Sequence, residues 1–333
     1  MIEELVNATG SLNERLNELM VSVEDRLQDA VRSPEPDIDA LTKHLAAAGG
    51  KRLRPALCLL TSFLGPNPGN EEAEISAAVV ELTHLATLYH DDVMDDAPMR
   101  RGVPSAQQIA GNSAAILAGD VLFAKASAMV AGLGPEAVRL HAVTFERLCF
   151  GQLRETLGAP DNVSPRDNYI HVLAEKTGYL IAASARYGVN ASGGAPDIAE
   201  AVADFGEKVG VAFQLADDVI DIMSDGDVTG KTPGTDLREG VETMPILLLK
   251  ERKDAGTIDA EGQEILDLLA GGRDDAQVER SVQLLRGHGV MDDVRQLAHD
   301  WSEDAVASLE VIPDGEVKDG LIAFARLMVD RIS

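Results

Sequence analysis

Residues 71–95 read EEAEISAAVVELTHLATLYHDDVMD, an apolar run that ends in a cluster of aspartates. Apolar residues recur along it at helical spacing, which predicts one long helix. The cluster follows the pattern DDxxD. The same pattern returns at residues 217–221 as DDVID, again at the end of a segment with helical periodicity. In each helix the first and last aspartates of the pattern are four residues apart, so they share a face.

Core packing does not explain these clusters, because carboxylates are rarely buried without a partner. Helix C-termini also disfavour negative charge, since the helix dipole is negative there. Oxygen ligands of this kind suit Mg²⁺, which binds through a few carboxylates together with substrate phosphates. We therefore expect Asp91 with Asp95, and Asp217 with Asp221, to face each other across a metal-bound diphosphate.

The composition is that of a large acidic protein with few aromatic residues. The 333 residues are 45% hydrophobic and 4% aromatic, and the net charge is −27. Leu, Ala and Val dominate the apolar residues, as helix-on-helix packing prefers. An acidic surface repels nucleic acid and anionic lipid headgroups, so neither is expected as a partner. If the ligand is a diphosphate, the few Lys and Arg residues must gather where it binds.

The N-terminus and the cysteines suggest a cytoplasmic protein. The first residues are acidic and lack the apolar core of a signal peptide. No apolar stretch reaches the ~18 residues that would span a bilayer, so no transmembrane segment is expected. Cys58 and Cys149 both lie in apolar runs and are interpreted as buried thiols of a reduced compartment.

Strand signals are nearly absent, and the periodicity predicts an all-α protein in one domain over residues 1–333. Residues 1–36 contain an N-terminal helix that serves packing or dimerisation. The loops 96–104 and 224–240 follow the two aspartate clusters. The expected helices are 3–31, 38–48, one from Pro55 to the loop 65–69, 71–95, 112–131, 135–157, 165–191 and 196–223, with four or five shorter ones in 241–331.

Basic residues occur in two places that suit phosphate oxygens. Arg100 and Arg101 come directly after the first cluster, and arginine grips phosphate with a planar fork of donors. Residues 49–55 read GGKRLRP, in which two glycines and three cations precede a helix. Ordinary surface arginines and a helix C-cap remain alternatives for these two features.

A third feature lies inside an apolar helix, where Thr177 and Gly178 follow Lys176. Such residues loosen a helix and free a backbone carbonyl, although a plain kink is an alternative. Gln214 lies three residues before Asp217 and shares its face.

These residues closely resemble the trans-isoprenyl diphosphate synthases, also called polyprenyl synthetases. The resemblance runs from about Gly49 to Pro245. Its pieces are GGKRLRP at 49–55, HLATLYHDDVMDDAPMRRG at 84–102, KTG at 176–178, FQLADDVID at 213–221 and GKTPGTDLREG at 230–240. The resemblance implies a helical bundle around a deep central cavity, usually as a homodimer. The implied reaction joins an allylic diphosphate, such as farnesyl or geranylgeranyl diphosphate, head to tail with isopentenyl diphosphate.

The resemblance also implies residue roles. The Mg²⁺ ligands would be Asp91, Asp95, Asp217, Asp218 and Asp221. The isopentenyl diphosphate site would hold Lys51, Arg54, His84 and Arg101. The allylic substrate would contact Arg100, Lys176, Thr177, Gln214 and Lys231. The residues closest to the chemistry would be Lys176, Thr177, Gln214, Asp91 and Asp217.

The implied mechanism makes physical sense, because Mg²⁺ and cationic side chains take up charge as diphosphate leaves. The dipoles of Thr177 and Gln214 would stabilise the carbocation, and a closed cavity would exclude water. One position departs from the family pattern: Val241 stands where a second lysine often follows DLREG. Another residue, such as Arg238, would then supply that phosphate contact.

Product length should depend on the floor of the cavity. Ala86 and Thr87 lie one turn before Asp91, and Thr83 lies a further turn down. These side chains are small, which predicts a long product of hexaprenyl to decaprenyl length, of the kind handed to membrane enzymes for quinone synthesis. A geranylgeranyl product is the alternative if Phe145 or Phe150 closes the tunnel.

Three other interpretations remain. A terpene cyclase or head-to-head synthase would usually lack the GGKR element and a second full DDxxD. A non-catalytic subunit of a heteromeric synthase would typically have lost an acidic motif. An acidic scaffold protein would need neither Arg100 and Arg101 nor the basic run at 51–54. The sequence leaves open the preferred primer, the chain length and the need for a second subunit.

Overall fold

The computed structural model describes residues 10–224 and 233–332. Helices make up almost all of its regular structure, and the described part contains one two-stranded sheet. The helices expected over 112–131, 135–157 and 196–223 have those bounds, and the long acidic-ended helix spans Glu71–Met94. Between residue 241 and residue 332, five α-helices and one short 3-10 helix follow one another, and four or five helices were expected there. The prediction of an all-α fold is confirmed.

Contacts divide the chain into two compact units, which are described separately. The first unit is Met1–Leu148, Tyr179–Gly206 and Ser308–Ala323, and the second is Cys149–Gly178, Glu207–Ala307 and Phe324–Ser333. The single domain expected over 1–333 stays a prediction.

The first unit contains these elements: α2 (Gly10–Ala30), α3 (Pro36–Ala47), α4 (Leu53–Ser62), α5 (Glu71–Met94), β1 (Met99–Arg100), β2 (Val103–Pro104), α6 (Ala106–Ala110), α7 (Asn112–Ala131) and α10 (Tyr179–Ala191). The second contains α9 (Pro165–Leu173), η1 (Ala174–Gly178), α13 (Thr235–Glu239), α14 (Met244–Asp254), α15 (Ala260–Gly271), α16 (Asp275–Gly287), α17 (Val290–Ala307) and η2 (Asp330–Ile332). Helices α8 (Pro135–Leu157), α11 (Pro196–Met223) and α18 (Glu316–Val329) contribute residues to both.

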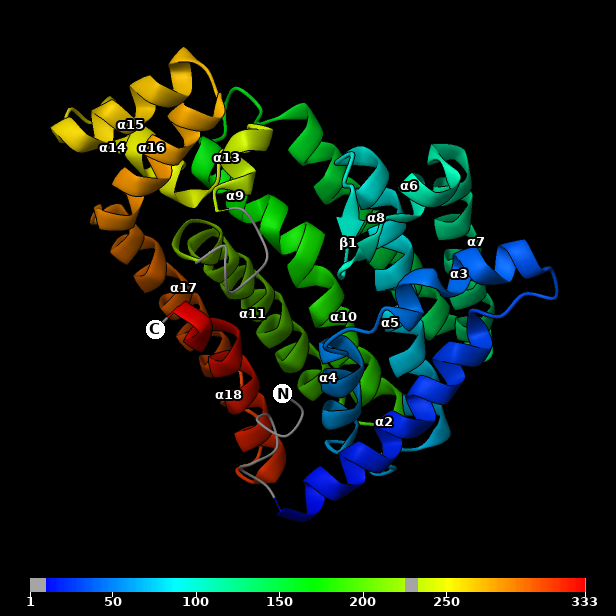
Figure 1. Cartoon of the computed structure of the whole chain (residues 1–333). Coiled ribbons are helices and arrows are strands. Elements are labelled where there is room, and N and C mark those ends of the chain that lie inside the picture. Colours follow the sequence, from blue (N-terminus) through cyan, green and yellow to red (C-terminus); the bar gives the residue numbers. More distant parts are fainter. Residues whose placement is uncertain (1–9, 225–232, 333) are drawn as a thin grey trace. The chain divides into compact units, whose positions relative to one another are not determined.

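Helix α5 is the centre of the first unit, where α2, α4, α7 and α10 pack around it (Figure 1). The side chain of Asn70 caps its start by accepting a hydrogen bond from the Ala73 N–H at 3.0 Å, and three glutamates in its first turn favour the helix dipole. Small residues allow the helices to approach closely. A Cβ atom on Gly119 of α7, for example, would lie 3.1 Å from the Ala86 carbonyl oxygen.

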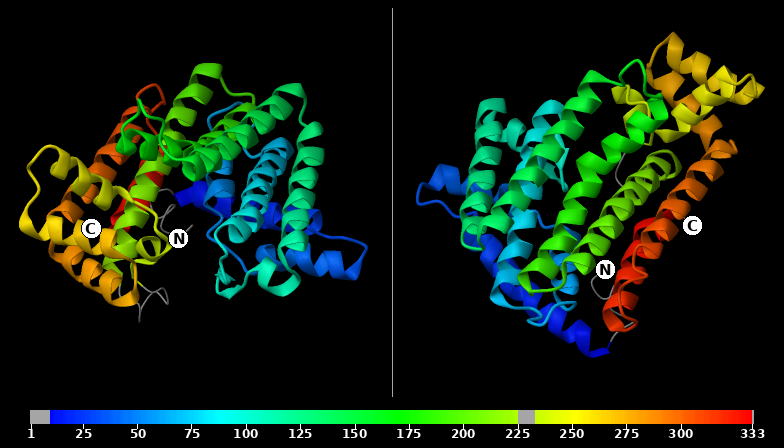
Figure 2. Two further views of the ribbon diagram at one scale, coloured as in Figure 1. Left: turned by 90° about the horizontal axis from the view of Figure 1, so that it is seen from above. Right: turned by 180° about the vertical axis from the view of Figure 1, so that it is seen from behind.

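The core of the second unit joins the later part of α11 to the C-terminal helices. Buried Ala212 and Leu215 of α11 belong to the same apolar cluster as Val294 and Ala298 of α17. Both Figure 1 and Figure 2 show these two helices side by side. The cluster also takes in Val329 and Ile332 at the C-terminus, so it anchors the end of the chain to this unit.

Cys149 and helix α7 differ from what the sequence predicted. Cys58 and Cys149 are both free, but Cys149 is exposed rather than buried, because it lies on an outward face of α8 beside the half-exposed Phe150. Helix α7 is long and apolar enough, by length and composition, to cross a membrane, although core helices of soluble proteins pass the same test. The expected lack of a membrane-spanning segment therefore stays a prediction.

Candidate active site

The first aspartate cluster sits where α5 ends. Asp95 is the C-cap, and its N–H donates to the Asp91 carbonyl at 2.8 Å, which keeps the two side chains one turn apart on one face. Asp92 points inward instead and is fully buried. Its carboxylate accepts a hydrogen bond from Nε of Arg100 at 2.6 Å, yet burial outweighs this charge and raises the pKa of Asp92. Asp92 therefore ties the following hairpin to α5, and Asp91 and Asp95 form the outer face.

The segment after this cluster is a tight hairpin, where the sequence predicted only a loop. Met99 pairs with Pro104 and Arg100 with Val103. Arg101 and Gly102 form the turn with φ of 53° and 78°, the left-handed values that a type I′ turn requires. A loop was expected because a two-residue strand leaves no periodic pattern to read.

Arg101 reaches from this turn into the first unit. Its Nη1 donates to the Leu45 carbonyl at 3.1 Å and also to the Gly49 carbonyl. A Cβ atom on Gly50 would lie 3.0 Å from the guanidinium carbon of Arg101. Gly50 thus makes room for Arg101, and Gly49 supplies a carbonyl that accepts from it.

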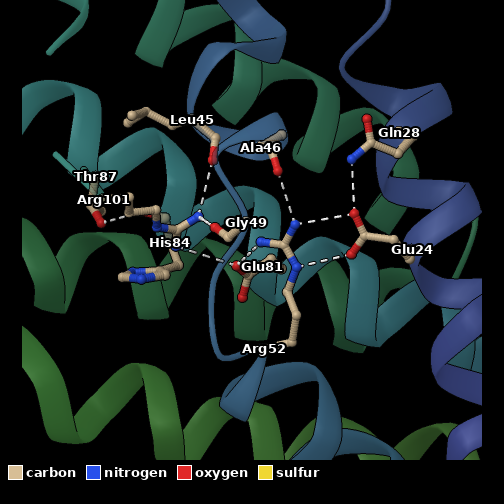
Figure 3. Close-up of polar contacts among 10 residues, drawn as sticks. All are labelled: Glu24, Gln28, Leu45, Ala46, Gly49, Arg52, Glu81, His84, Thr87 and Arg101. Carbon is tan, nitrogen blue, oxygen red and sulfur yellow. Dashed lines mark hydrogen bonds and ion pairs between the residues drawn. The ribbon is translucent and has the colours of Figure 1, made fainter. Parts of the chain in front are cut away.

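A buried glutamate that the sequence analysis missed organises the cations (Figure 3). Glu81 of α5 is 2% exposed, and its Oε1 lies 2.8 Å from Nη1 of Arg52 and 3.7 Å from Nη2 of Arg101. Arg52 also makes a two-pronged contact with Glu24 of α2, at 2.9 and 3.1 Å. The signal was a lone acidic residue inside the apolar run AAVVELT, because a carboxylate there requires a buried cation.

Three more residues of the predicted isopentenyl diphosphate site follow Arg52 in the chain or lie near Glu81. Arg54 has a buried Nε that finds no hydrogen-bond partner among the described residues, and burial lowers its pKa. Burial, reinforced by the charges of Arg54 and Arg101, lowers the pKa of His84 well below its usual value. His84 is therefore neutral near pH 7 and offers a hydrogen bond rather than a charge. Lys51 is exposed on the connection to α4. The structure thus brings Arg54, His84 and Arg101 together, with Lys51 beside them in the chain.

Backbone strain marks the same place. Among the described residues, the non-glycine positions with positive φ are Arg52, Asp96 and Arg101, at 50°, 48° and 53°. Side chains rarely adopt this conformation, and it tends to cluster at functional sites. All three residues flank the first aspartate cluster or the arginine cluster.

The predicted product-length residues lie further down α5. Ala86 is fully buried, and its carbonyl oxygen lies where Gly119 of α7 approaches α5, whereas Thr87 is half-buried. Thr83 is buried, and its hydroxyl donates to the Val79 carbonyl at 2.8 Å. Phe145 of α8 stacks on Phe123 of α7 with 3.8 Å between ring centroids. Their effect on product length stays a prediction.

The second aspartate cluster lies in the second unit, on α11. Asp217 forms an ion pair with Arg331, near the very end of the chain. The guanidinium of Arg331 also lies 5.0 Å from the ring centroid of Phe213, one turn earlier on α11. A residue 114 positions away therefore neutralises this carboxylate.

The other two carboxylates of this cluster accept hydrogen bonds from backbone N–H groups and from a side-chain hydroxyl. Asp218 is buried, and the Tyr169 hydroxyl donates to it, with 2.9 Å to each oxygen. The N–H of Met244 donates to it at 3.1 Å, but burial raises the pKa of Asp218 well above its usual value. Asp221 accepts a hydrogen bond from the Thr235 N–H at 3.1 Å, at the start of α13. The expected metal ligation by Asp217, Asp218 and Asp221 stays a prediction, as does the facing of the two clusters.

The Lys176-Thr177-Gly178 segment is a single π-helical turn, η1, within the region expected as one helix over 165–191. A Cβ atom on Gly178 would lie 2.7 Å from the Glu207 carbonyl oxygen, so glycine is needed for close packing on α11. Lys176 forms an ion pair with Glu155 at 2.7 Å. Thr177 is buried, and π-turns often mark functional sites.

The neighbouring Glu175 is a second buried carboxylate that the sequence analysis missed. It lies 3.4 Å from Nε of Arg154 and 3.3 Å from the ring of His171. These contacts fix the turn that carries Lys176 and Thr177.

The remaining predicted contacts are Gln214, Lys231 and Arg238. Gln214 is half-buried on α11, while Lys231 lies outside the described residues. Arg238, considered as a substitute for the lysine absent at Val241, donates to the Pro233 carbonyl at 2.5 Å and lies 3.5 Å from Asp275. It is therefore directed toward α16.

The donor set suits a hard cation shared with a ligand. Within residues 10–224 and 233–332, no three acidic, His or Cys side chains converge closely enough to hold an ion alone. Mg²⁺ usually needs only one or two carboxylates when phosphates supply the rest. Asp91 and Asp95, one turn apart at the end of α5, fit that requirement.

The family model for polyprenyl synthetase matches residues 35–285. The chain belongs to the polyprenyl synthetase family. It is 43% identical to a nonaprenyl diphosphate synthase of Mycobacterium tuberculosis over 93% of this chain and 91% of that protein. A geranylgeranyl pyrophosphate synthase of Corynebacterium glutamicum, solved with calcium and isoprenyl diphosphate, matches with TM-score 0.85 and 41% identity over 97% of this chain and 98% of that one. A polyprenyl synthase of Caulobacter crescentus, solved with the same ligands, matches with TM-score 0.87 and 32% identity over 100% and 98%.

Membership of the polyprenyl synthetase family confirms two predictions. The chain has the all-α isoprenoid-synthase fold, and it is an enzyme, a transferase of prenyl groups. Its substrates are those of the family, isopentenyl diphosphate and an allylic diphosphate.

Proposed function

We propose that the protein extends farnesyl or geranylgeranyl diphosphate with isopentenyl diphosphate, head to tail, to a polyprenyl diphosphate of hexaprenyl to decaprenyl length. The observation that carries this is the end of α5, where Asp91 and Asp95 lie next to the hairpin of Arg100 and Arg101. A long product is supported by the 43% identity to a nonaprenyl diphosphate synthase.

The roles of the residues follow from their surroundings. Arg54 and Arg101 bind the isopentenyl diphosphate, with exposed Lys51 completing the charge and neutral His84 donating a hydrogen bond. Asp91 and Asp95 would hold Mg²⁺ on the first unit, and Asp217, Asp218 and Asp221 would ligate it on the second. The metal would supply positive charge for the departing diphosphate.

In the second unit, the π-turn places the Thr177 dipole, and Gln214 adds another, to stabilise the allylic cation. The isopentenyl double bond attacks that cation, and the lost proton passes to the released diphosphate. Lys176 stays paired with Glu155 until an anionic ligand competes for it.

The test is product formation by the purified chain alone. Farnesyl and isopentenyl diphosphates with Mg²⁺ should give products that, after dephosphorylation, run with hexaprenol to decaprenol standards. Asp91→Asn should lower the rate by about 10²-fold or more, whereas Asp161→Asn in an exposed loop should not. Absence of any product from the chain alone would favour a non-catalytic subunit.

A geranylgeranyl product is the second candidate, because the 41%-identical solved structure carries that name. A single product of four isoprene units in the same assay would establish it.

We also propose a cytoplasmic homodimer without a membrane-spanning segment. The support for the dimer is the outer face of α6 and α7, where Ile109, Ile116 and Leu117 are 57%, 41% and 62% exposed. Apolar side chains at this density commonly pack against a second copy. Light scattering should give twice the chain mass, and Leu117→Lys should lower it. A monomer at micromolar concentration would contradict this.

A further inference from the structure

The second unit contains a cavity that none of the predicted metal or substrate residues lines. Its volume is about 400 Å³, and residues of α13, α14 and α15 form most of its wall. Helices α14 and α15 pack against each other here (Figure 1). Small-molecule sites have volumes of roughly 300–1,000 Å³. The cavity is therefore large enough to hold a small ligand.

The floor of the cavity is apolar. Leu237 of α13, Ile246 of α14 and Leu266 of α15 are buried, line the cavity and belong to the apolar core of this unit. Val241, in the connection between α13 and α14, also lines it and is 38% exposed. Ligand sites are commonly lined by apolar side chains with a few polar groups that fix the orientation of the ligand. This floor therefore suits the apolar part of a ligand.

The polar groups of the cavity are mostly cations. Lys250 and Lys253 of α14 line it together with Arg273, which lies between α15 and α16. Lys250 forms an ion pair with Glu242 at 2.5 Å. Within the described part of the chain, the exposed side chains of Lys253 and Arg273 have no hydrogen bond or ion pair. Asp254 also lines the cavity, so three cations stand beside two carboxylates in a protein whose net charge is −27.

The position of the Arg273 guanidinium depends on Gly240. This glycine is the C-cap of α13 with φ of 87°, and a Cβ atom on it would overlap Nη1 of Arg273. The guanidinium is thus held against the backbone next to Val241, at the edge of the apolar floor. A favourable helix dipole accounts for Lys253 in the last turn of α14, but Arg273 lies outside the helices and has no such explanation.

We propose that this cavity is a second binding site, which takes a phosphate ester with a short apolar tail. The tail lies on the floor of Ile246 and Leu266, and Arg273 and Lys253 bind the phosphate. The planar fork of an arginine matches phosphate oxygens. A phosphate monoester carries a charge of about −1.5 to −2 at pH 7, which matches two cations without an acidic partner. A fatty acid has a single negative charge and fits this pair less well.

Isothermal titration calorimetry with n-octyl phosphate, below its micelle-forming concentration and without Mg²⁺, tests the proposal. Arg273→Gln and Lys253→Gln should each weaken binding by about tenfold. Arg252→Gln is the matched control, because it removes the same charge from the same turn of α14. Arg252 pairs with Asp293 of α17 and does not line the cavity, so this variant should bind like the unmodified protein.

Two further ligands separate the headgroup from the tail. Inorganic phosphate lacks the tail and 1-octanol lacks the charge, so each should bind more weakly than octyl phosphate by about tenfold or more. Octyl phosphate bound to the arginines of the first unit would not respond to Arg273→Gln or Lys253→Gln. Equal affinity in these two variants and the unmodified protein would therefore overturn the inference, as would inorganic phosphate binding as tightly as octyl phosphate. Neither measurement requires prenyl transfer, so the proposed function can fail without affecting this test.

Discussion

Arg52 and Glu81 form an ion pair at 2.8 Å that is almost excluded from solvent, with side-chain exposures of 9% and 3%. The pair joins the N-cap of α4 to the middle of α5 (Figure 3). Glu81 also faces Arg101 at 3.7 Å, so one carboxylate lies between two guanidinium groups and offsets only part of their charge. Arg52 is thus held by carboxylates of the protein itself, whereas Arg54, Lys51 and the only partly balanced Arg101 carry the charge that remains for a ligand.

Glu81→Ala should destabilise the protein strongly, because it leaves Arg52 buried without its partner. Breaking a buried pair in this way costs about 3–5 kcal/mol. Urea unfolding measures the change. Glu24→Ala removes the other partner of Arg52, but Glu24 is 39% exposed, and its loss should cost about 1 kcal/mol or less. Similar losses in the two variants would show that Glu81 is not the central carboxylate.

Gly210→Ala should disturb the turn that carries Thr177. A Cβ atom on Gly210 would overlap the Cα atom of Gly178, so α11 and η1 must separate. Overpacking of this kind costs about 1–3 kcal/mol, and the shift of Thr177 should lower kcat more than it raises KM. Gly287→Ala is the matched control, since nothing lies within 4 Å of its Cβ position. A kcat equal to that of the unmodified protein would argue against a role for this packing.

The contribution of His84 and His141 to stability should fall as the pH drops below about 6.5, because both histidines are neutral in the folded protein. Burial lowers the pKa of His141, and burial together with arginine charges lowers that of His84. The unfolded chain therefore binds more protons than the folded one below the unfolded pKa, and the stabilisation present above it is lost on acidification. Unfolding at pH 8 and pH 5.5 measures the difference. His141→Gln should reduce it, whereas the half-exposed His299→Gln should not.

Ala86→Phe should shorten the product. Ala86 is fully buried, so a ring placed there must displace its neighbours or fill space along α5 that a product tail would otherwise use. The product distribution after dephosphorylation measures the effect. Ala131→Phe, at the exposed end of α7, should leave the distribution as it is. An unchanged product length in Ala86→Phe would mean that this turn of α5 does not line the space occupied by the product tail.

The sequence was sufficient for features with a local pattern. The bounds of α7, α8 and the aspartate-bearing α11 follow from their periodicity, and the Thr177-Gly178 irregularity became a π-turn. Contacts between distant segments were not accessible in this way. Glu81 pairs with Arg52 and faces Arg101 in the hairpin turn. The Tyr169 hydroxyl donates a hydrogen bond to Asp218, which is 49 residues away. The residue types of Glu81 and Tyr169 do not indicate these partners, because the partners come together only when the helices pack.

The pairing of Arg331 with Asp217 predicts how the C-terminus affects metal binding. Arg331 occupies a carboxylate that the second aspartate cluster would offer to Mg²⁺. Both side chains are partly exposed, so Arg331→Ala should cost only about 0.2–1 kcal/mol of stability without metal. Because the competing cation is gone, Mg²⁺ with inorganic pyrophosphate should then raise the melting temperature more than in the unmodified protein. Arg326→Ala removes an exposed cation from the last turn of α18 and controls for net charge. If both variants respond like the unmodified protein, the ion pair serves only to anchor the chain end.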